Sequence, residues 1–177
     1  FFPIVKNAKS AYEAAAILNN NIFEMVGVIY STKRPKADQS PYESIDAGLA
    51  SCTGLSFMLI DACRSVGIPA RFVGTPMWYN NSGNHSWVEI WDNGWHFTGA
   101  FEPTGDRLNE GWFASLAARA VEGHPEYGIY AATWKKTGIF FPMDWKPGVE
   151  KYYATDLTSS YQKYHDDKFD SRGLKEV

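Results

Sequence analysis

The first helical pattern of the chain lies at residues 7–26, where apolar side chains recur with helical spacing among polar ones. Ser10 precedes this run and Glu13 follows three residues later, an arrangement typical of a helix-starting capping box. The next stretch, 28–51, is polar and contains proline. We therefore expect one helix here, followed by a long loop with a short helical turn near 44–49.

A second helix is predicted for the apolar run CTGLSFMLIDACRSV, residues 52–66, because Gly67 and Pro69 follow it and stop a helix. Residues 70–76 then have the composition of a short strand.

Two further segments alternate apolar and polar residues, HSWVEIW at 85–91 and WHFTGAF at 95–101. The Asn93–Gly94 step between them suits a tight hairpin turn. The middle of the chain therefore reads as helix, strand, loop and antiparallel hairpin.

The C-terminal part has weaker patterns. We expect a helix or helical turn in 111–122, strands within 128–134 and 149–157, and a polar tail from 165 onward. We expect a single domain over residues 1–165, with 166–177 either a polar tail or the start of a missing segment.

Composition narrows the class of function. Lys and Arg number 17 and Asp and Glu 20, which gives a formal charge of −3 and argues against a nucleic-acid partner. No apolar run approaches the roughly 20 residues that span a bilayer, so no transmembrane segment is expected. The first residue is not Met, which we interpret as a mature form or a piece of a longer parent chain with further domains.

The two cysteines, Cys52 and Cys63, fall in the same predicted helix. Eleven residues of helix separate them by ~16 Å along its axis, which is beyond disulfide reach. We expect Cys63 to be a core residue and Cys52 to lie at the helix N-terminus, where the helix dipole favours a thiolate. Neither a disulfide nor a cysteine zinc site is expected.

A thiolate nucleophile also needs an imidazole held in the right tautomer by a third polar group. Of the four histidines, His85 begins a predicted strand directly after a Gly/Asn loop. A position at the start of a strand beside a loop is typical of residues at the rim of a cleft. The others lie within the hairpin, before a proline in a loop, and in the polar tail, at His96, His124 and His165.

Two blocks carry a resemblance to a known family: SCTGLSFMLIDACRSVGIPARFVGTP and NHSWVEIWDNGWHFTGAFEP. Together, over about residues 40–113, they resemble the transglutaminase-like superfamily, a branch of the papain-like cysteine-peptidase fold. The resemblance implies an α+β class, with N-terminal helices and the cysteine helix packed on an antiparallel sheet. It assigns Cys52 as nucleophile and His85 as general base.

The third catalytic position departs from the family pattern, which places Asp four residues after the strand Trp. Here that position, counted from Trp95, is Gly99. The nearest acid is Glu102, which would need a bulge at Gly99 to share its face; Asp92 lies in the hairpin on the other side. We assign Glu102 as the acid that orients His85; failing that, a neutral group orients it or the protein is catalytically weak. We interpret Glu89 as a surface residue or ion-pair partner.

The oxyanion hole needs at least two donors. One is the backbone N–H of Cys52, and the second is expected from the preceding loop, where the candidates are Gln39, Ser40, Tyr42 and Ser44. Tyr42 and Trp78 are also candidate walls of a substrate cleft.

The resulting hypothesis is acyl transfer from a peptide or protein carboxamide, as a protease, an amidase or a transglutaminase. No metal or other cofactor is expected, since no EF-hand loop is present. Two alternatives stay open: an inactive relative that binds peptide or glycan, and a structural module of a larger envelope protein. The resemblance favours a bacterial envelope or secreted location.

Overall fold

The computed structural model describes residues 1–169. By contacts between Cα atoms the chain forms two compact units. Unit 1 comprises Phe1–Val73 and Ser86–Gly111, and unit 2 comprises Gly74–His85 together with the described residues from Trp112 on. The expectation of one domain over 1–165 stays a prediction, and residues 170–177 lie outside the described part of the chain.

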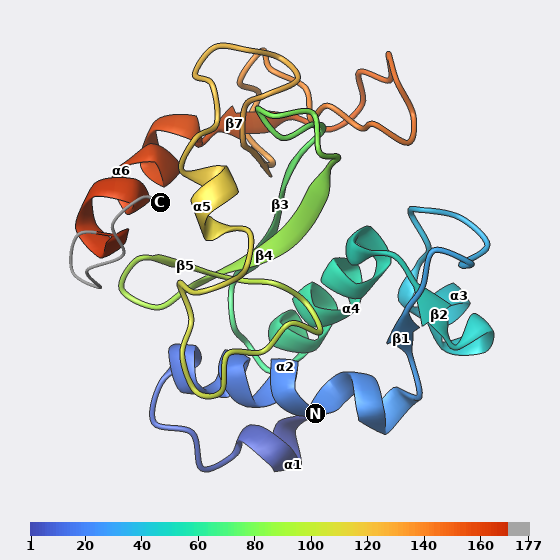
Figure 1. Ribbon diagram of the computed structural model, residues 1–177. Helices are drawn as coiled ribbons and strands as arrows, with labels where there is room; N and C mark the ends of the chain where they lie inside the picture. Colours follow the sequence, from blue (N-terminus) through green and yellow to red (C-terminus); the bar gives the residue numbers. More distant parts are fainter. Residues whose placement is uncertain (170–177) are drawn as a thin grey trace. The chain divides into compact units, whose positions relative to one another are not determined.

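Four helices belong to unit 1: α1 (Phe2–Val5), α2 (Ala11–Val26), α3 (Pro41–Ala47) and α4 (Cys52–Ser65). Helix α4 packs against both α2 and α3, and α2 also contacts α1 (Figure 1). Apolar side chains such as Leu18 and Ile22 of α2 and Leu55 and Leu59 of α4 are almost completely buried. Burial of these faces stabilises the helices more than propensity alone would.

The ends of α2 and α4 follow the sequence pattern. Ser10 caps α2 by accepting a hydrogen bond from Glu13 N, while the Glu13 carboxylate accepts from Lys9 N, one residue before the cap. Helix α4 ends at Ser65, and Gly67 follows with φ of 85°, a left-handed conformation that glycine adopts without strain. Both predicted helices are confirmed.

The strands that lie wholly or mostly in unit 1 form two groups. In the first group β1 (Ile29–Tyr30) and β2 (Leu49–Ala50) form a short parallel pair. The sequence pattern did not indicate this pair. In the second group β4 is hydrogen-bonded to β5 and β3. The bounds are β3 (Ala70–Thr75), β4 (His85–Trp91) and β5 (Trp95–Thr98).

The predicted hairpin between β4 and β5 is confirmed. The two strands pair antiparallel, with Glu89 opposite Phe97 and Ile90 opposite His96. The loop has three residues, 92–94, and Asn93 and Gly94 both have positive φ, which these two residue types adopt more readily than others. All of β4 but Trp91 is buried, including its polar residues, so its alternating sequence does not mark a solvent-exposed face.

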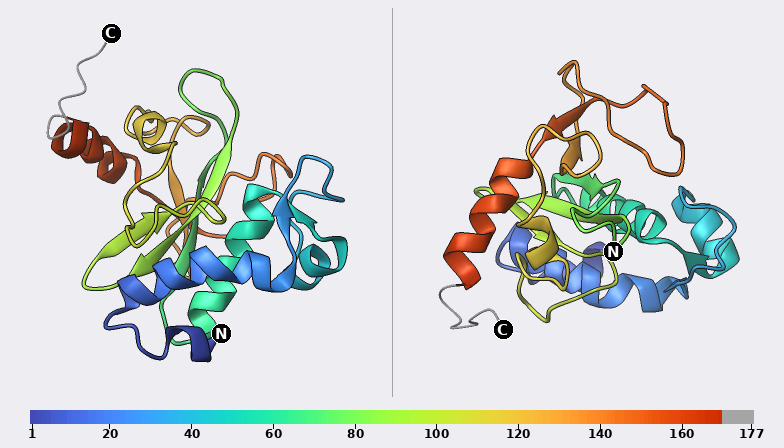
Figure 2. Two further views of the ribbon diagram at one scale, coloured as in Figure 1. Left: turned by 60° about the horizontal axis from the view of Figure 1, so that its bottom comes forward. Right: turned by 45° about the horizontal axis from the view of Figure 1, so that its top comes forward.

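Unit 2 contains β6 (Tyr130–Ala132), β7 (Ala154–Asp156), α5 (Ala114–Ala117) and α6 (Thr158–Phe169). β6 and β7 pair antiparallel, and α5 packs against α6 (Figure 2). Both strands lie inside the segments expected for them. The helix expected in 111–122 is only one turn long, and α6 covers the beginning of the segment that we predicted as a polar tail.

The α+β class is confirmed. None of the helices in residues 1–169 is both long enough and apolar enough to cross a membrane.

Candidate active site

Cys52 is the first residue of α4, as expected, and is half-buried. The preceding residue, Ser51, is the N-cap: its hydroxyl accepts from Gly54 N at 3.2 Å and donates to Ala37 O at 2.5 Å. The start of the helix is therefore tied to the loop that precedes it. A thiol in this place is exposed to the positive end of a 14-residue helix, which stabilises a thiolate.

Helix α3 lies directly beside this helix start. A Cβ at Gly54 would come within 3.2 Å of Ala50 Cβ and 3.3 Å of Ser44 Oγ, so the approach leaves no room for a larger residue without a shift. Gln39 adds two hydrogen bonds, from Nε2 to Glu43 O at 3.3 Å and to Leu49 O at 3.0 Å. The segment before Cys52 is thus held by the packing of α3 against Gly54 and by the hydrogen bonds of Gln39.

These contacts place the four candidates for the second oxyanion donor. The Gln39 amide nitrogen is engaged by two carbonyls, and Ser40 caps α3 by accepting from Glu43 N. Tyr42 is 86 % exposed, whereas Ser44 is fully buried beside Gly54, and its hydroxyl has no hydrogen-bond partner among residues 1–169. The side chains of Ser40 and Gln39 therefore stabilise the conformation of the segment that leads to Cys52.

The residue after Cys52 is connected to the residue after His85. Thr53 Oγ1 lies 3.1 Å from Ser86 Oγ, and both side chains are buried. This hydrogen bond joins the first turn of α4 to the beginning of β4 within unit 1.

Glu102 follows β5 in a turn. β5 ends at Thr98, Glu102 N donates to Gly99 O at 3.2 Å, and Phe101 has a φ of 64°. The turn directs the Glu102 side chain back over Gly99, where an added Cβ would overlap Oε2 and lie 2.9 Å from Cδ. The bulge that the sequence suggested is not formed; a turn brings the carboxylate to the place of the missing side chain at 99.

Asn19 of α2 holds this turn, a role that the sequence analysis did not identify. Its Nδ2 donates to Thr98 Oγ1 at 2.9 Å and to Gly99 O at 2.8 Å, and its Oδ1 accepts from Phe101 N at 2.9 Å. Nothing in the run Asn19–Asn21 distinguishes the first asparagine except its place on the apolar face of the predicted helix.

His85 lies in unit 2, at the end of its first segment, and its ring is surrounded by aromatic rings of the same unit. The centroid distances are 4.9 Å to Trp112, 4.8 Å to Phe113 and 6.2 Å to Trp78. Phe113 and Trp78 are buried, whereas Trp112 is 58 % exposed. Trp78, expected as a cleft wall, thus packs beside the imidazole.

Two other histidines have structural partners. Both ring nitrogens of His96 are engaged, Nε2 with Asp92 O at 3.0 Å and Nδ1 with Asn109 Nδ2 at 2.8 Å. His124 stacks on Tyr127 and receives two backbone N–H groups at Nδ1. His165 lies among residues whose side chains are outside the described set.

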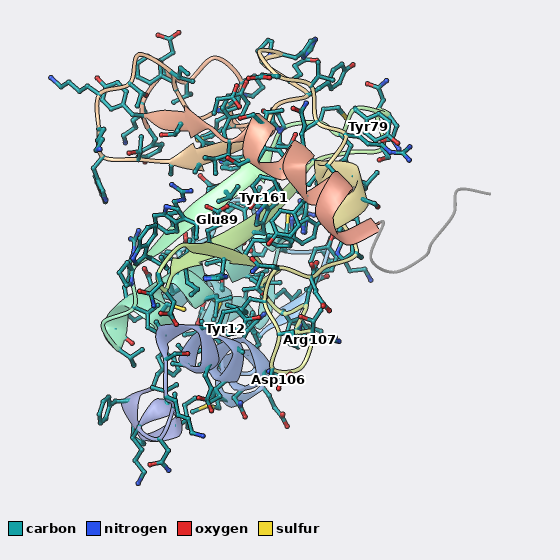
Figure 3. All side chains as sticks on the ribbon, turned by 90° about the vertical axis from the view of Figure 1, so that its left-hand side faces the viewer. Tyr12, Tyr79, Glu89, Asp106, Arg107 and Tyr161 are labelled. Atoms are coloured by element: carbon teal, nitrogen blue, oxygen red, sulfur yellow. The ribbon has the colours of Figure 1, made fainter. Side chains whose placement is uncertain are left out.

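The remaining acids in and around the hairpin serve the fold. Asp92 Oδ2 accepts from Tyr12 N at 2.9 Å. Tyr12 also bonds the backbone of Leu108, and Figure 3 shows it beside the loop that carries Asp106 and Arg107. Glu89 is buried and pairs with Arg71 at 2.6 Å, which confirms its interpretation as an ion-pair partner.

Cys63 is a core residue, as predicted. It is completely buried in α4, and burial raises the pKa of its thiol to about 12. Both cysteines of the sequence lie in the described part of α4 and no disulfide joins them. Across residues 1–169 no group of three or more His, Cys, Asp or Glu side chains is arranged to hold a metal ion.

Unit 1 therefore contains Cys52 and Glu102, and unit 2 contains His85 with its aromatic rings. The assignment of these three residues to one catalytic triad stays a prediction.

Comparisons with known proteins give a family match and several similar solved structures. The family model described as the transglutaminase-like superfamily matches residues 2–100. No curated protein matches the sequence.

Among the solved structures that are similar to this chain are the following two. One is a candidate cysteine protease from Cytophaga hutchinsonii, with 19 % identity, a TM-score of 0.48, and coverage of 58 % of this chain and 35 % of that one. The other is described as a TGase, with 14 % identity, a TM-score of 0.45, and coverage of 90 % and 41 %. This chain thus spans less than half the length of either.

Proposed function

This chain belongs to the transglutaminase-like superfamily, and we propose that it is a thiol-dependent acyl-transfer enzyme. Cys52 is the nucleophile, His85 the general base and Glu102 the carboxylate that orients His85. The substrate is a carboxamide of a peptide or protein. The observation that carries the proposal is the position of Cys52 at the N-terminus of α4, with Thr53 hydrogen-bonded to Ser86, the neighbour of His85.

In the first half-reaction the Cys52 thiol gives its proton to His85, and the sulfur attacks the carbonyl carbon of the carboxamide. The C=O π electrons move to oxygen and form a tetrahedral oxyanion, which the positive end of α4 stabilises. When the C–N bond breaks, the imidazolium returns the proton to the departing nitrogen. Ammonia or an amine leaves, and the acyl group remains on Cys52 as a thioester.

In the second half-reaction His85 removes a proton from water or from an amine, which attacks the thioester carbon. The C–S bond breaks, and the proton returns to the thiolate of Cys52. Water gives hydrolysis and an amine gives transfer, so the nature of the acceptor decides between protease or amidase and transglutaminase. The same three side chains serve both outcomes.

A second function is favoured by one specific observation, the Gly at position 99. In this second function the chain, which lacks the family's acid at position 99, binds a peptide or glycan and catalyses no reaction. The exposed aromatic residues of unit 2, Trp112, Trp134 and Tyr152, suit such binding.

The experiment that tests the proposal measures acyl transfer from glutaminyl peptides to hydroxylamine, and in parallel the release of ammonia. We expect turnover in the wild type and in Cys63→Ala, and none in Cys52→Ala. Binding of the peptides with equal affinity to wild type and Cys52→Ala, without turnover in either, supports the second function. Turnover that persists in Cys52→Ala contradicts the proposed nucleophile.

A further inference from the structure

Three consecutive asparagines of α2 have different partners. Asn20 Nδ2 bonds Ala16 O of its own helix and Gly105 O, and Asn21 Nδ2 bonds only Ile17 O of the helix. The Asn19 side chain makes no bond to its own helix: the residue is 2 % exposed, and its amide reaches the turn after β5.

The three bonds of Asn19 satisfy two donors and one acceptor of its amide. Nδ2 engages Thr98 Oγ1 and Gly99 O, and Oδ1 engages Phe101 N. These bonds fix the backbone on both sides of Ala100. Because buried hydrogen bonds of this kind are costly to leave unmade, the turn has one favoured conformation.

That conformation sets the place of the Glu102 carboxylate. Glu102 N is hydrogen-bonded to Gly99 O at 3.2 Å, the same carbonyl that Asn19 Nδ2 holds at 2.8 Å. The side chain lies over the Gly99 Cα, and an added Cβ would be 2.9 Å from Cδ and 3.0 Å from Cβ of Glu102. The absence of a side chain at 99 is what makes this position available.

We propose that Asn19 is a positioning residue of the active site: it clamps the turn of residues 98–101 so that the Glu102 carboxylate occupies the space of the missing side chain at Gly99. The inference rests on the proposed function, because it gives Asn19 its effect through the role of Glu102 toward His85. Asn19 itself touches no reacting atom.

The test is a double-mutant cycle between Asn19→Ala and Glu102→Gln, read as kcat and KM for the hydroxylamine reaction. Loss of the clamp displaces the carboxylate, and a displacement of about 1 Å costs on the order of 100-fold in rate. We expect that loss in kcat for Asn19→Ala, an unchanged KM, and no further loss when Asn19→Ala is added to Glu102→Gln. Asn20→Ala is the matched control, since Asn20 Nδ2 also bonds a distant carbonyl, that of Gly105, but none in the turn of residues 98–101. We expect it to keep the wild-type kcat.

A second variant moves the carboxylate without touching Asn19. Gly99 does not have a positive φ, so alanine fits its backbone, but the methyl group takes the space of Glu102 Oε2. Gly99→Ala is therefore expected to fold and to show the same loss in kcat as Asn19→Ala. If Asn19→Ala does not fold, Gly99→Ala alone tests whether the position of the Glu102 carboxylate determines kcat.

Three results overturn the inference. The first is equal kcat loss for Asn19→Ala with and without Glu102→Gln, which separates Asn19 from Glu102. The second is wild-type kcat in Gly99→Ala. The third is Cys52-dependent turnover that Glu102→Gln leaves unchanged.

Failure of the proposed function is seen separately, as the lack of any Cys52-dependent turnover in the wild type. The clamp is then judged from crystal structures of the wild type and Asn19→Ala. We expect the Glu102 carboxylate above Gly99 in the first and displaced in the second; an unchanged carboxylate in the second overturns the inference.

Discussion

Thr53 Oγ1 and Ser86 Oγ form a buried hydrogen bond of 3.1 Å between the first turn of α4 and the beginning of β4. The two residues follow Cys52 and His85 in the chain, so this contact joins the immediate sequence neighbours of both candidate catalytic residues. Sequence distance between the two hydroxyls is 33 residues.

A first prediction concerns this pair. Ser86→Ala leaves the buried Thr53 hydroxyl without its partner, which costs about 1–3 kcal/mol of unfolding free energy. Thr53→Val/Ser86→Ala removes both hydroxyls and is expected to cost less than the sum of the single changes. Urea unfolding measures both. Strict additivity of the two single changes would show that the hydroxyls do not interact.

A second prediction concerns Cys63, whose thiol has a pKa raised by burial to about 12. Well below pH 9 the thiol is protonated in both the folded and the unfolded chain. As the pH rises from 9 to about 12, the unfolded thiol ionises and the folded one does not, so stability decreases. The pH dependence of unfolding in this range should be weaker in Cys63→Ala than in the wild type; equal dependence contradicts a buried, protonated Cys63.

A third prediction concerns Glu43 at the start of α3. Its pKa is lowered to about 2, first by the hydrogen bond with Lys36 and then by the bonds with Ser40. The carboxylate therefore stabilises the folded chain above pH 4.5, and this contribution is lost as the pH falls from 4.5 to about 2. The stability difference between wild type and Glu43→Gln should shrink over that range at low salt. A constant difference would contradict a role for the charge.

A fourth prediction moves the acid to position 99. In Gly99→Asp/Glu102→Ala the new side chain starts in the space that the Glu102 carboxylate occupies in the wild type. We expect kcat about tenfold above that of Glu102→Ala, equivalent to about 1.4 kcal/mol. Gly99→Asn/Glu102→Ala has the same shape without the charge and should not recover. Equal recovery by Asn would assign the effect to shape.

The sequence predicts those parts of the molecule in which local pattern and burial agree. Helix α2 with its Ser10 cap, helix α4 with Cys52 at its start, and the β4–β5 hairpin all follow from spacing and turn chemistry. Cys63 in the core follows from the helical period, because it lies about three turns from Cys52 on one face.

The features that the sequence does not predict depend on long-range contacts. Asn19 meets the turn at Gly99 across about 80 residues of chain, and its place on the apolar face of the helix, which alone separates it from Asn20 and Asn21, does not reveal this partner. The turn that replaces the expected bulge needs that contact. Helix α6 has a polar sequence, and contacts with distant residues support it: it packs against α5, and Thr158 Oγ1 accepts a hydrogen bond from Ile129 N.

The pairing of Cys52 with His85 is tested most directly by the alkylation rate of Cys52 with iodoacetamide between pH 5 and 9, followed by mass spectrometry. This measurement needs no knowledge of the substrate. We expect rapid modification of Cys52 at pH 6.5, about two units below the pKa of an ordinary thiol, with Cys63 unmodified. We also expect that His85→Ala removes this reactivity at pH 6.5 and His124→Ala does not. A pH profile for His85→Ala equal to that of the wild type would contradict the pairing of Cys52 with His85.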